Sequence, residues 1–341
     1  MKRDNCIDSI KGIGVILVIL GHTYDIPVFL CNFIYSFHMP LFFIISGYLY
    51  NTQKYSGWSA RKFILNKAKS YLLPYTIYSL INIAINFVWE YCFYGNVIPA
   101  KRMLKYVADA FYCRADDAYM KNFVPVWFLL CLFISSVLFW LITKYCEKYT
   151  GAICVSLAIV GYLWCSIVDY RIFWNLPTAL IAILFIYLGY AIKKYCIIDK
   201  ILNNKIALVT IIVSCLAIGI PSAVLNVDGI GMIQNRYGNI ALFLIASISL
   251  SLVAILCCKN IKVLQNKFFV WLGRNTMLVI GYNFFMLALT TELYYYIPIV
   301  SNYRINWVVS FIITTIGMVV FILVWNKLKS FCLTKVRKAK S

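Results

Sequence analysis

Residues 7–22 read IDSIKGIGVILVILGH, and residues 33–50 read FIYSFHMPLFFIISGYLY. Both stretches are apolar over most of their length, and a helix needs about 20 such residues to cross the core of a bilayer. They lack the alternation of barrel strands, and backbone groups in hydrocarbon must find their hydrogen bonds within the segment. The two stretches therefore predict membrane helices, and they hold both histidines of the chain, His22 and His38.

The composition extends this prediction to the whole chain. Of the 341 residues, 63% are apolar and 13% are charged, whereas a soluble domain has about 45–50% apolar and about 25% charged residues. Apolar runs recur at residues 7–24, 33–51, 71–93, 124–143, 151–168, 176–192, 206–225, 238–257, 268–289 and 305–326. We therefore expect an all-α polytopic membrane bundle of about ten transmembrane helices, with residues 1–326 as the membrane domain.

The basic residues indicate the orientation of this bundle. The net charge is +20, and ten spans put 24 of the 32 Lys and Arg residues on the side of the N-terminus. Because cytoplasmic loops are enriched in Lys and Arg, both termini are predicted to be cytoplasmic. The charge then needs no nucleic-acid partner, and the basic tail at 327–341 is expected to contact membrane lipids. The predicted location is a cell membrane, as a multi-pass protein of a bacterial inner or plasma membrane.

Residues 94–123 form a long predicted loop on the outer side, with five of the eight outer basic residues. A loop of this length can fold over the bundle as a lid or remain a solvated connection. Both possibilities stay open.

The cysteines and histidines do not suggest a metal site. Thirteen cysteines are scattered without a C-x-x-C pair, and the chain has two histidines. Zinc sites and redox pairs need closer spacings. We expect no metal cofactor, and cysteines that act as small hydrophobic side chains.

Polar side chains align along the first span. Lys11 and His22 are eleven positions apart, so they differ by about 20° around a helix and by about 16 Å along it. Asp8 lies three residues before Lys11 and can pair with it. Charges within a span are costly and often mark functional sites, although Asp8 and Lys11 can also be interfacial anchors and His22 a helix cap. Three glycines in the same segment allow a second helix or a ligand to approach closely.

The second span carries a histidine near its outer end. Pro40 is tolerated near the first turn of a helix, so His38 is expected at a depth similar to that of His22. Two imidazoles that face one outward-opening cavity can hold a hydroxyl group and remove its proton, as suits an unperturbed pKa of about 6.5. Ser46 and Gly47, deeper in this span, favour tight helix packing.

A basic segment precedes the third span. Five of the sixteen residues between Lys54 and Lys69 are basic. Such a cluster on the cytoplasmic side can bind either phosphate groups or anionic lipid headgroups.

The first two stretches together resemble the opening of the integral-membrane acyltransferase 3 family, most closely its fucose O-acetylase-like branch. Weaker likenesses follow at VWFLLCLF (126–133), LPTALIAILFIYLGYAIKK (176–194) and WLGRNTMLVIGYN (271–283). The resemblance covers residues 4–326. It implies a ten-helix module that moves acetyl groups from cytoplasmic acetyl-CoA to sugars of surface glycans.

The resemblance also implies site residues. The family's basic residue and histidine, separated by ten positions, correspond to Lys11 and His22, with lysine where arginine is usual. Lysine keeps the charge but lacks the planar fork for bidentate contacts, which favours a salt bridge to Asp8.

Candidate contacts of the two substrates complete the set. The acyl-CoA is expected at Arg61, Lys67 and Lys69, just before the third span. The acceptor is expected at Trp127, Asn283 and Ser46. Many relatives have a histidine where Asn283 stands, so its neutral amide argues against an acid-base role.

The expected function is that of a membrane O-acetyltransferase, with acetyl-CoA as co-substrate and a glycan or lipid-linked sugar as acceptor. His22 acts as general base or carries the acetyl group briefly, His38 orients the acceptor or shares the proton, and Asp8 holds Lys11. One alternative is a transporter or flippase for a glycan precursor, because such proteins also use charges within spans and an outward cavity. Another is an enzyme that transfers succinyl or a different acyl group.

Overall fold

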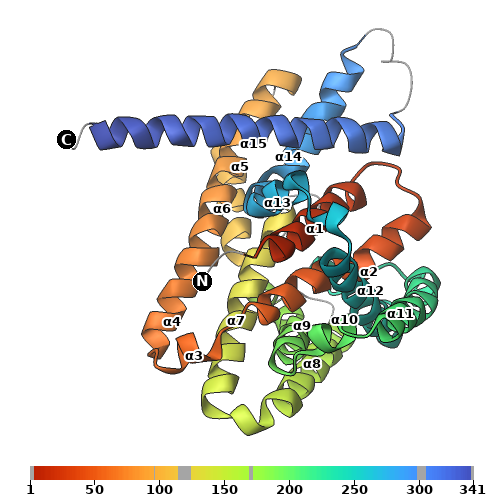
Figure 1. Cartoon of the computed structure of the whole chain (residues 1–341). Helices are drawn as coiled ribbons and strands as arrows, with labels where there is room; N and C mark the ends of the chain where they lie inside the picture. The colour runs from red at the N-terminus through yellow and green to blue at the C-terminus, as the bar shows by residue number, and fades with distance from the viewer. Residues whose placement is uncertain (1–3, 96, 114–123, 169–171, 298–304, 339–341) are drawn as a thin grey trace.

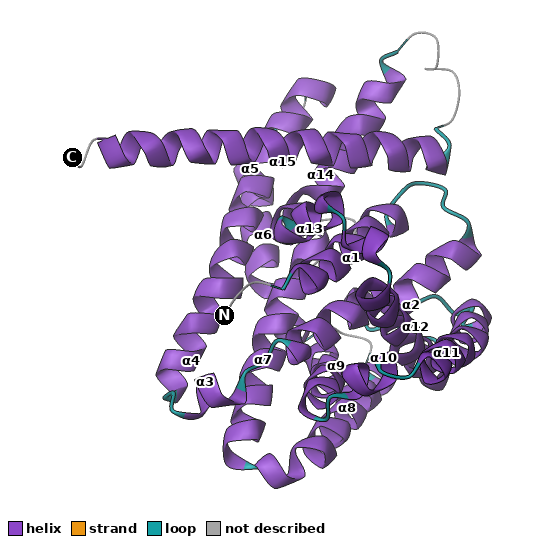
Figure 2. Cartoon of the chain, viewed as in Figure 1, coloured by secondary structure: helices purple, strands orange, loops and turns teal. Residues whose placement is uncertain are grey.

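The structure is a computed structural model, and it describes residues 4–95, 97–113, 124–168, 172–297 and 305–338. Within these ranges the chain is almost entirely helical and has no β-strand (Figure 2). Nine helical stretches of the described chain are long and apolar enough to cross a membrane. The predicted all-α membrane bundle is therefore confirmed. The first predicted span is not among the nine, because α1 (Asn5–Gly21) has 17 residues, two of which are Asp8 and Lys11.

The other long helices follow the predicted runs. They are α2 (Val28–Tyr48), α5 (Leu73–Tyr94), α7 (Trp127–Tyr145), α8 (Thr150–Ile167), α9 (Leu176–Lys194), α11 (Lys205–Leu225), α12 (Ile240–Asn260), α14 (Thr276–Tyr295) and α15 (Trp307–Lys338). Shorter helices are α3 (Thr52–Ser56), α4 (Ala60–Lys67), α6 (Ala100–Tyr112), α10 (Ile197–Leu202) and α13 (Lys267–Arg274). In Figure 1, α15 lies along one side of the molecule against α14, and α8 and α9 lie at the opposite side.

The outer faces of the bundle are apolar. Ile206 and Val213 on α11 and Ile316 on α15 each expose more than half of their surface. A soluble protein buries such side chains, whereas in a bilayer they contact lipid tails at no cost. The described surface thus fits a membrane environment.

Glycines bring α2 and α9 into backbone contact. A Cβ atom at Gly47 would lie 1.9 Å from the carbonyl oxygen of Ile186, and one at Gly189 would lie 1.8 Å from that of Ile44. Neither site has room for any side chain, so these two helices pack as closely as small-residue interfaces in membranes allow. The predicted tight packing at Gly47 is found.

A second glycine contact joins α1 to α13 and alters one predicted span. A Cβ atom at Gly12 would lie 2.1 Å from the carbonyl oxygen of Phe269, and one at Gly273 would lie 1.7 Å from that of Asp8. The helix α13 ends at Arg274, Asn275 is its C-cap residue, and α14 begins at Thr276. The prediction of one continuous span at 268–289 is therefore wrong, because its first part turns aside to pack along α1.

The predicted loop at 94–123 contains a helix. In its described part, α6 packs against α5, where the Tyr75 hydroxyl donates to the carbonyl of Ala110. The indole of Trp174 donates to the carbonyl of Phe111 at 2.8 Å. The described part is thus a docked helix and not a plain solvated connection, while residues 114–123 lie outside the described residues.

Pro40 lies inside α2, well after the start of the helix at Val28, so the expected position near the first turn is wrong, and the proline does not end the helix. A proline has no backbone N–H, so the carbonyl four residues earlier loses its helical partner. That carbonyl belongs to Ser36, and the Ser247 hydroxyl on α12 donates to it at 2.5 Å. The loss is thus compensated by a contact between two helices, as is common in membrane proteins.

A π-helical segment, Ala68–Leu72, joins α4 to α5. Pro74 follows it, and the proline ring would clash with the carbonyl of Ser70 in a regular α-helix. The wider π turn relieves this clash and shapes the wall of the site described below.

We predict that Gly47→Ala destabilises the bundle, because its methyl group would overlap the backbone of α9. Overpacking of this kind costs about 1–3 kcal/mol or more. The unfolding temperature of the detergent-solubilised protein should fall. Gly57→Ala is the matched control, since no atom lies within 4 Å of its Cβ position. Equal unfolding temperatures for the two variants would contradict the backbone contact.

Candidate functional site

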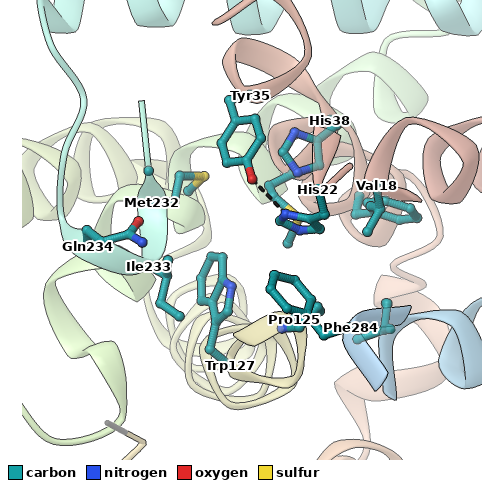
Figure 3. A pocket seen from close by; sticks show the side chains of 14 residues that line it. Val18, His22, Tyr35, His38, Pro125, Trp127, Met232, Ile233, Gln234 and Phe284 are labelled. Carbon is teal, nitrogen blue, oxygen red and sulfur yellow. Dashed lines mark hydrogen bonds between the residues drawn. The ribbon is translucent and has the colours of Figure 1, made fainter. Parts of the chain in front are cut away.

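A cavity of about 160 Å³ contains both histidines. Its walls come from α1, α2, α7, α14 and the short helix Met232–Gln234. In Figure 3, Tyr35, His22 and His38 lie together on one side, and Trp127 and Ile233 lie across from them. The structure therefore gathers in one place side chains that are far apart in the sequence.

His22 terminates α1 as its C-cap residue. Its ring atom Nδ1 lies 2.7 Å from the Tyr35 hydroxyl, and its ring centroid lies 4.6 Å from that of Phe284. The imidazole is thus held by one hydrogen bond and by ring contacts with Tyr35 and Phe284. Nε2 is the ring nitrogen left for other partners.

His38 has its tautomer set by the backbone. Nδ1 lies 2.8 Å from the carbonyl oxygen of Ile34, and a carbonyl only accepts, so Nδ1 must carry the hydrogen. In a neutral imidazole the other nitrogen is then an acceptor. The ring centroid of His38 lies 5.1 Å from that of Tyr35, which therefore contacts both histidines.

Sequence reasoning missed two polar residues of this cavity, Tyr35 and Gln234. Tyr35 precedes His38 by three positions, so helical periodicity places them on one face of α2 and could have identified it. Gln234 is exposed at the cavity and comes from the loop between α11 and α12. Helical periodicity, which relates residues on one face of a helix, gives no information about a residue in such a loop.

A second cavity, of about 300 Å³, lies next to the first. Its lining includes two cations, Lys11 on α1 and Arg274 on α13, together with Ser46 and Tyr71. Tyr71 belongs to the π-helical segment, which therefore forms part of the wall. Since Lys11 lines this cavity and His22 the first, the polar stripe along α1 serves both.

Asp8 is a buried carboxylate beside the second cavity. Its Oδ2 lies 3.2 Å from Nε of Arg274, and the Asp8 side chain is 4% exposed. Arg274 also donates to the side-chain oxygen of Asn5 at 3.0 Å. The expected pair of Asp8 with Lys11 stays a prediction, and Arg274 is a partner that the sequence did not reveal.

The basic segment before α5 lies partly near this cavity. The Lys67 ammonium lies within 5.5 Å of the ring centroids of Phe63 and Tyr71. Because Tyr71 lines the cavity, Lys67 is close to it, whereas Arg61 and Lys69 are exposed on the surface. Of the three candidate acyl-CoA contacts, the structure brings only Lys67 next to the second cavity.

The three candidate acceptor contacts separate in the structure. Trp127 lines the first cavity with the histidines, and Ser46 lines the second. Asn283 lines neither cavity and is 1% exposed on α14. A role of Asn283 in direct substrate contact is therefore not supported by its position.

The described residues contain no group of three or more His, Cys, Asp and Glu side chains that could hold a metal ion. The imidazoles of the first cavity are suited to acid-base chemistry, and the cations of the second cavity are suited to binding anions.

Comparisons with known proteins agree with this arrangement. The family model described as an acyltransferase domain, that of the acyltransferase 3 family, matches residues 4–324. Nodulation protein NolL of Sinorhizobium fredii is 47% identical over 58 residues, which is 14% of this chain and 16% of that protein. The match thus spans only a small part of that relative. No solved structure matches the chain.

We predict that Asp8 and Arg274 stabilise the protein jointly. A double-mutant cycle of Asp8→Asn and Arg274→Gln should give a coupling free energy of about 0.5–3 kcal/mol in unfolding measurements, as is found for contacting residues. The control cycle is Glu147→Gln with Lys194→Gln, an exposed pair at 3.4 Å. Exposed pairs contribute only about 0–1 kcal/mol. A coupling no larger than that of the control would contradict a stabilising contact between the half-exposed Arg274 and the buried Asp8 carboxylate.

Proposed function

Because the chain belongs to the acyltransferase 3 family and is a multi-pass membrane protein, we propose that it moves an acetyl group from cytoplasmic acetyl-CoA to a glycan hydroxyl. The acceptor is a cell-surface or lipid-linked glycan. One observation carries the proposal. Two adjacent cavities share one face of α1, with two imidazoles in one cavity and two cations in the other.

The second cavity is the candidate donor site. Phosphate groups of CoA are anions, and Lys11 and Arg274 supply positive charge from two helices. Lys67 adds a third cation near Tyr71 at the same wall. The nucleotide end of acetyl-CoA binds at this basic side, and its thin pantetheine arm points along α1 towards the histidines.

The first cavity is the candidate site of transfer. The acceptor oxygen attacks the thioester carbonyl, so a C–O bond forms and the C–S bond breaks. His22 takes the hydroxyl proton and passes it to the departing thiolate of CoA, which balances the reaction. A base at Nε2 requires the proton of His22 on Nδ1, so Nδ1 donates to the Tyr35 oxygen in the reactive tautomer.

His38 and Trp127 position the acceptor. With its Nδ1 proton bound to the Ile34 carbonyl, His38 presents Nε2 as an acceptor for a second sugar hydroxyl. Trp127 offers an apolar ring face, and sugar rings also have apolar faces that an aromatic ring can cover. The Tyr35 ring contacts both imidazoles and holds them at a fixed distance and orientation relative to each other.

The proposed orientation has both termini in the cytoplasm and the first cavity towards the outside. The start of α1 and the end of α15 lie towards the same side in Figure 1, which supports termini on one side of the membrane. The short helix Met232–Gln234, part of a loop expected outside, borders the histidine cavity. The membrane that we propose is a bacterial inner or plasma membrane.

We predict that His22→Ala and His22→Gln remove acetylation of the cell's glycan. Loss of a general base lowers the rate by about 10²- to 10⁴-fold. Mass spectrometry of glycans from a deletion strain that carries each variant measures the effect. The variants should accumulate in the membrane and unfold at the wild-type temperature. Undiminished acetylation by either variant would exclude His22 as the base. A substrate that crosses the bilayer unmodified, without acetyl-CoA, would indicate a transporter.

We predict that Lys11→Ala and Tyr35→Phe affect different kinetic constants. Loss of a charged contact to phosphate costs about 1.5–3 kcal/mol, so Lys11→Ala should raise the KM for acetyl-CoA by about 10-fold or more. Tyr35→Phe removes the hydrogen bond to His22 and should lower kcat with little change in that KM. Transfer of radiolabelled acetyl groups to the glycan in membrane fractions measures both. The reverse pattern would contradict the donor and transfer sites.

A further inference from the structure

Two side chains belong to the linings of both cavities. Phe42 on α2 and Ile280 on α14 border the histidine cavity and also the cavity that contains Lys11 and Arg274. Both residues are buried, Phe42 at 6% and Ile280 at 3% exposure. They therefore form a common wall between the proposed donor and transfer sites.

The positions of Phe42 and Ile280 along their helices relate this wall to the histidines. Phe42 follows His38 by four residues, one helical turn further into α2. Ile280 precedes Phe284 by one turn, and the Phe284 ring contacts His22. The wall thus lies one helical turn away from the imidazoles, in the direction of the proposed donor site.

The Phe42 ring rests on α1 between the two ends of the polar stripe. A Cβ atom at Gly14 would lie 2.8 Å from Cζ of Phe42, so the ring occupies the space that a side chain would take. On its other side the ring packs against Phe128, with centroids 5.8 Å apart. Gly14 lies between Lys11 and His22, and an acyl group that moves along α1 must pass this ring.

We propose that Phe42 is a specificity-determining residue that, together with Ile280, selects the acetyl group among acyl groups. This inference rests on the proposed function. The wall is apolar, so a succinyl carboxylate would lose its hydration there without gaining a partner. A butyryl chain adds two methylene groups that must find space beside the ring. The acetyl group adds a single methyl group beyond the carbonyl, and it crosses with the least displacement of Phe42.

The test compares acyl donors in membrane fractions from the glycan-bearing deletion strain. Radiolabelled acetyl-, butyryl- and succinyl-CoA are supplied separately, and label in the glycan is counted. Wild type should transfer acetyl groups best. Phe42→Ala should raise the ratio of butyryl to acetyl transfer by about 10-fold, because one or two methylenes in an apolar site account for factors of this size. Phe42→Leu, which removes less volume, should give a smaller increase in the same ratio.

Phe43→Ala is the matched control. Phe43 is the next residue on α2, is fully buried and contacts Phe128, but it lines neither cavity. Its loss should lower stability as much as the loss of Phe42 without changing the donor ratio. Gly14→Ala, which displaces the Phe42 ring, should also change the ratio. A ratio that stays within twofold of wild type in both Phe42 variants, or that shifts equally in Phe43→Ala, would overturn the inference.

The outcome for wild type separates this inference from the proposed function. If wild type transfers acetyl groups but the Phe42 variants keep its donor ratio, the selection by Phe42 is wrong and the acetyl transfer stands. If wild type transfers label from none of the three donors, the proposed function is itself wrong, and the selection by Phe42 is overturned with it.

Discussion

The backbone contact between α1 and α13 determines where the charges of the second cavity lie. Because Gly12 and Gly273 have no side chains, the two helices approach until backbone carbonyls fill the space between them. This approach brings Arg274 into contact with Asp8 and into the lining of the same cavity as Lys11. A carboxylate as buried as that of Asp8 is costly without a partner, so the close packing and the ion pair depend on each other.

The spans could be predicted from sequence because a bilayer sets both the length and the polarity of a helix that crosses it. The division of residues 268–289 into α13 and α14 could not. Apolar residues continue on both sides of Asn275, and the reason for the break is a contact with α1, more than 250 residues earlier. The helix α6 was missed for a similar reason, because its position depends on hydrogen bonds to distant segments.

The candidate site was predictable only in part. Counting residues along one helix places Lys11 and His22 on a common face, and the structure has them on the linings of adjacent cavities. The partners of these residues come from elsewhere in the chain. Tertiary packing brings Arg274 and Gln234 to the cavities, and the periodicity of the local sequence does not predict such packing. Asn283 occupies the position suggested by the family resemblance, yet its side chain is buried away from both cavities.

The π-helical segment Ala68–Leu72 determines how α4 is rotated relative to α5. A π turn contains one residue more than an α turn. Deleting one residue there would rotate α4 by about 100° relative to α5 and would bring back the clash between the Pro74 ring and the backbone carbonyl one turn before it. Lys67 would then leave the ring of Tyr71, while Phe63, which lies on α4 as well, would move together with Lys67. The number of residues between the basic segment and α5 therefore determines which basic side chain lies next to Tyr71 and the second cavity.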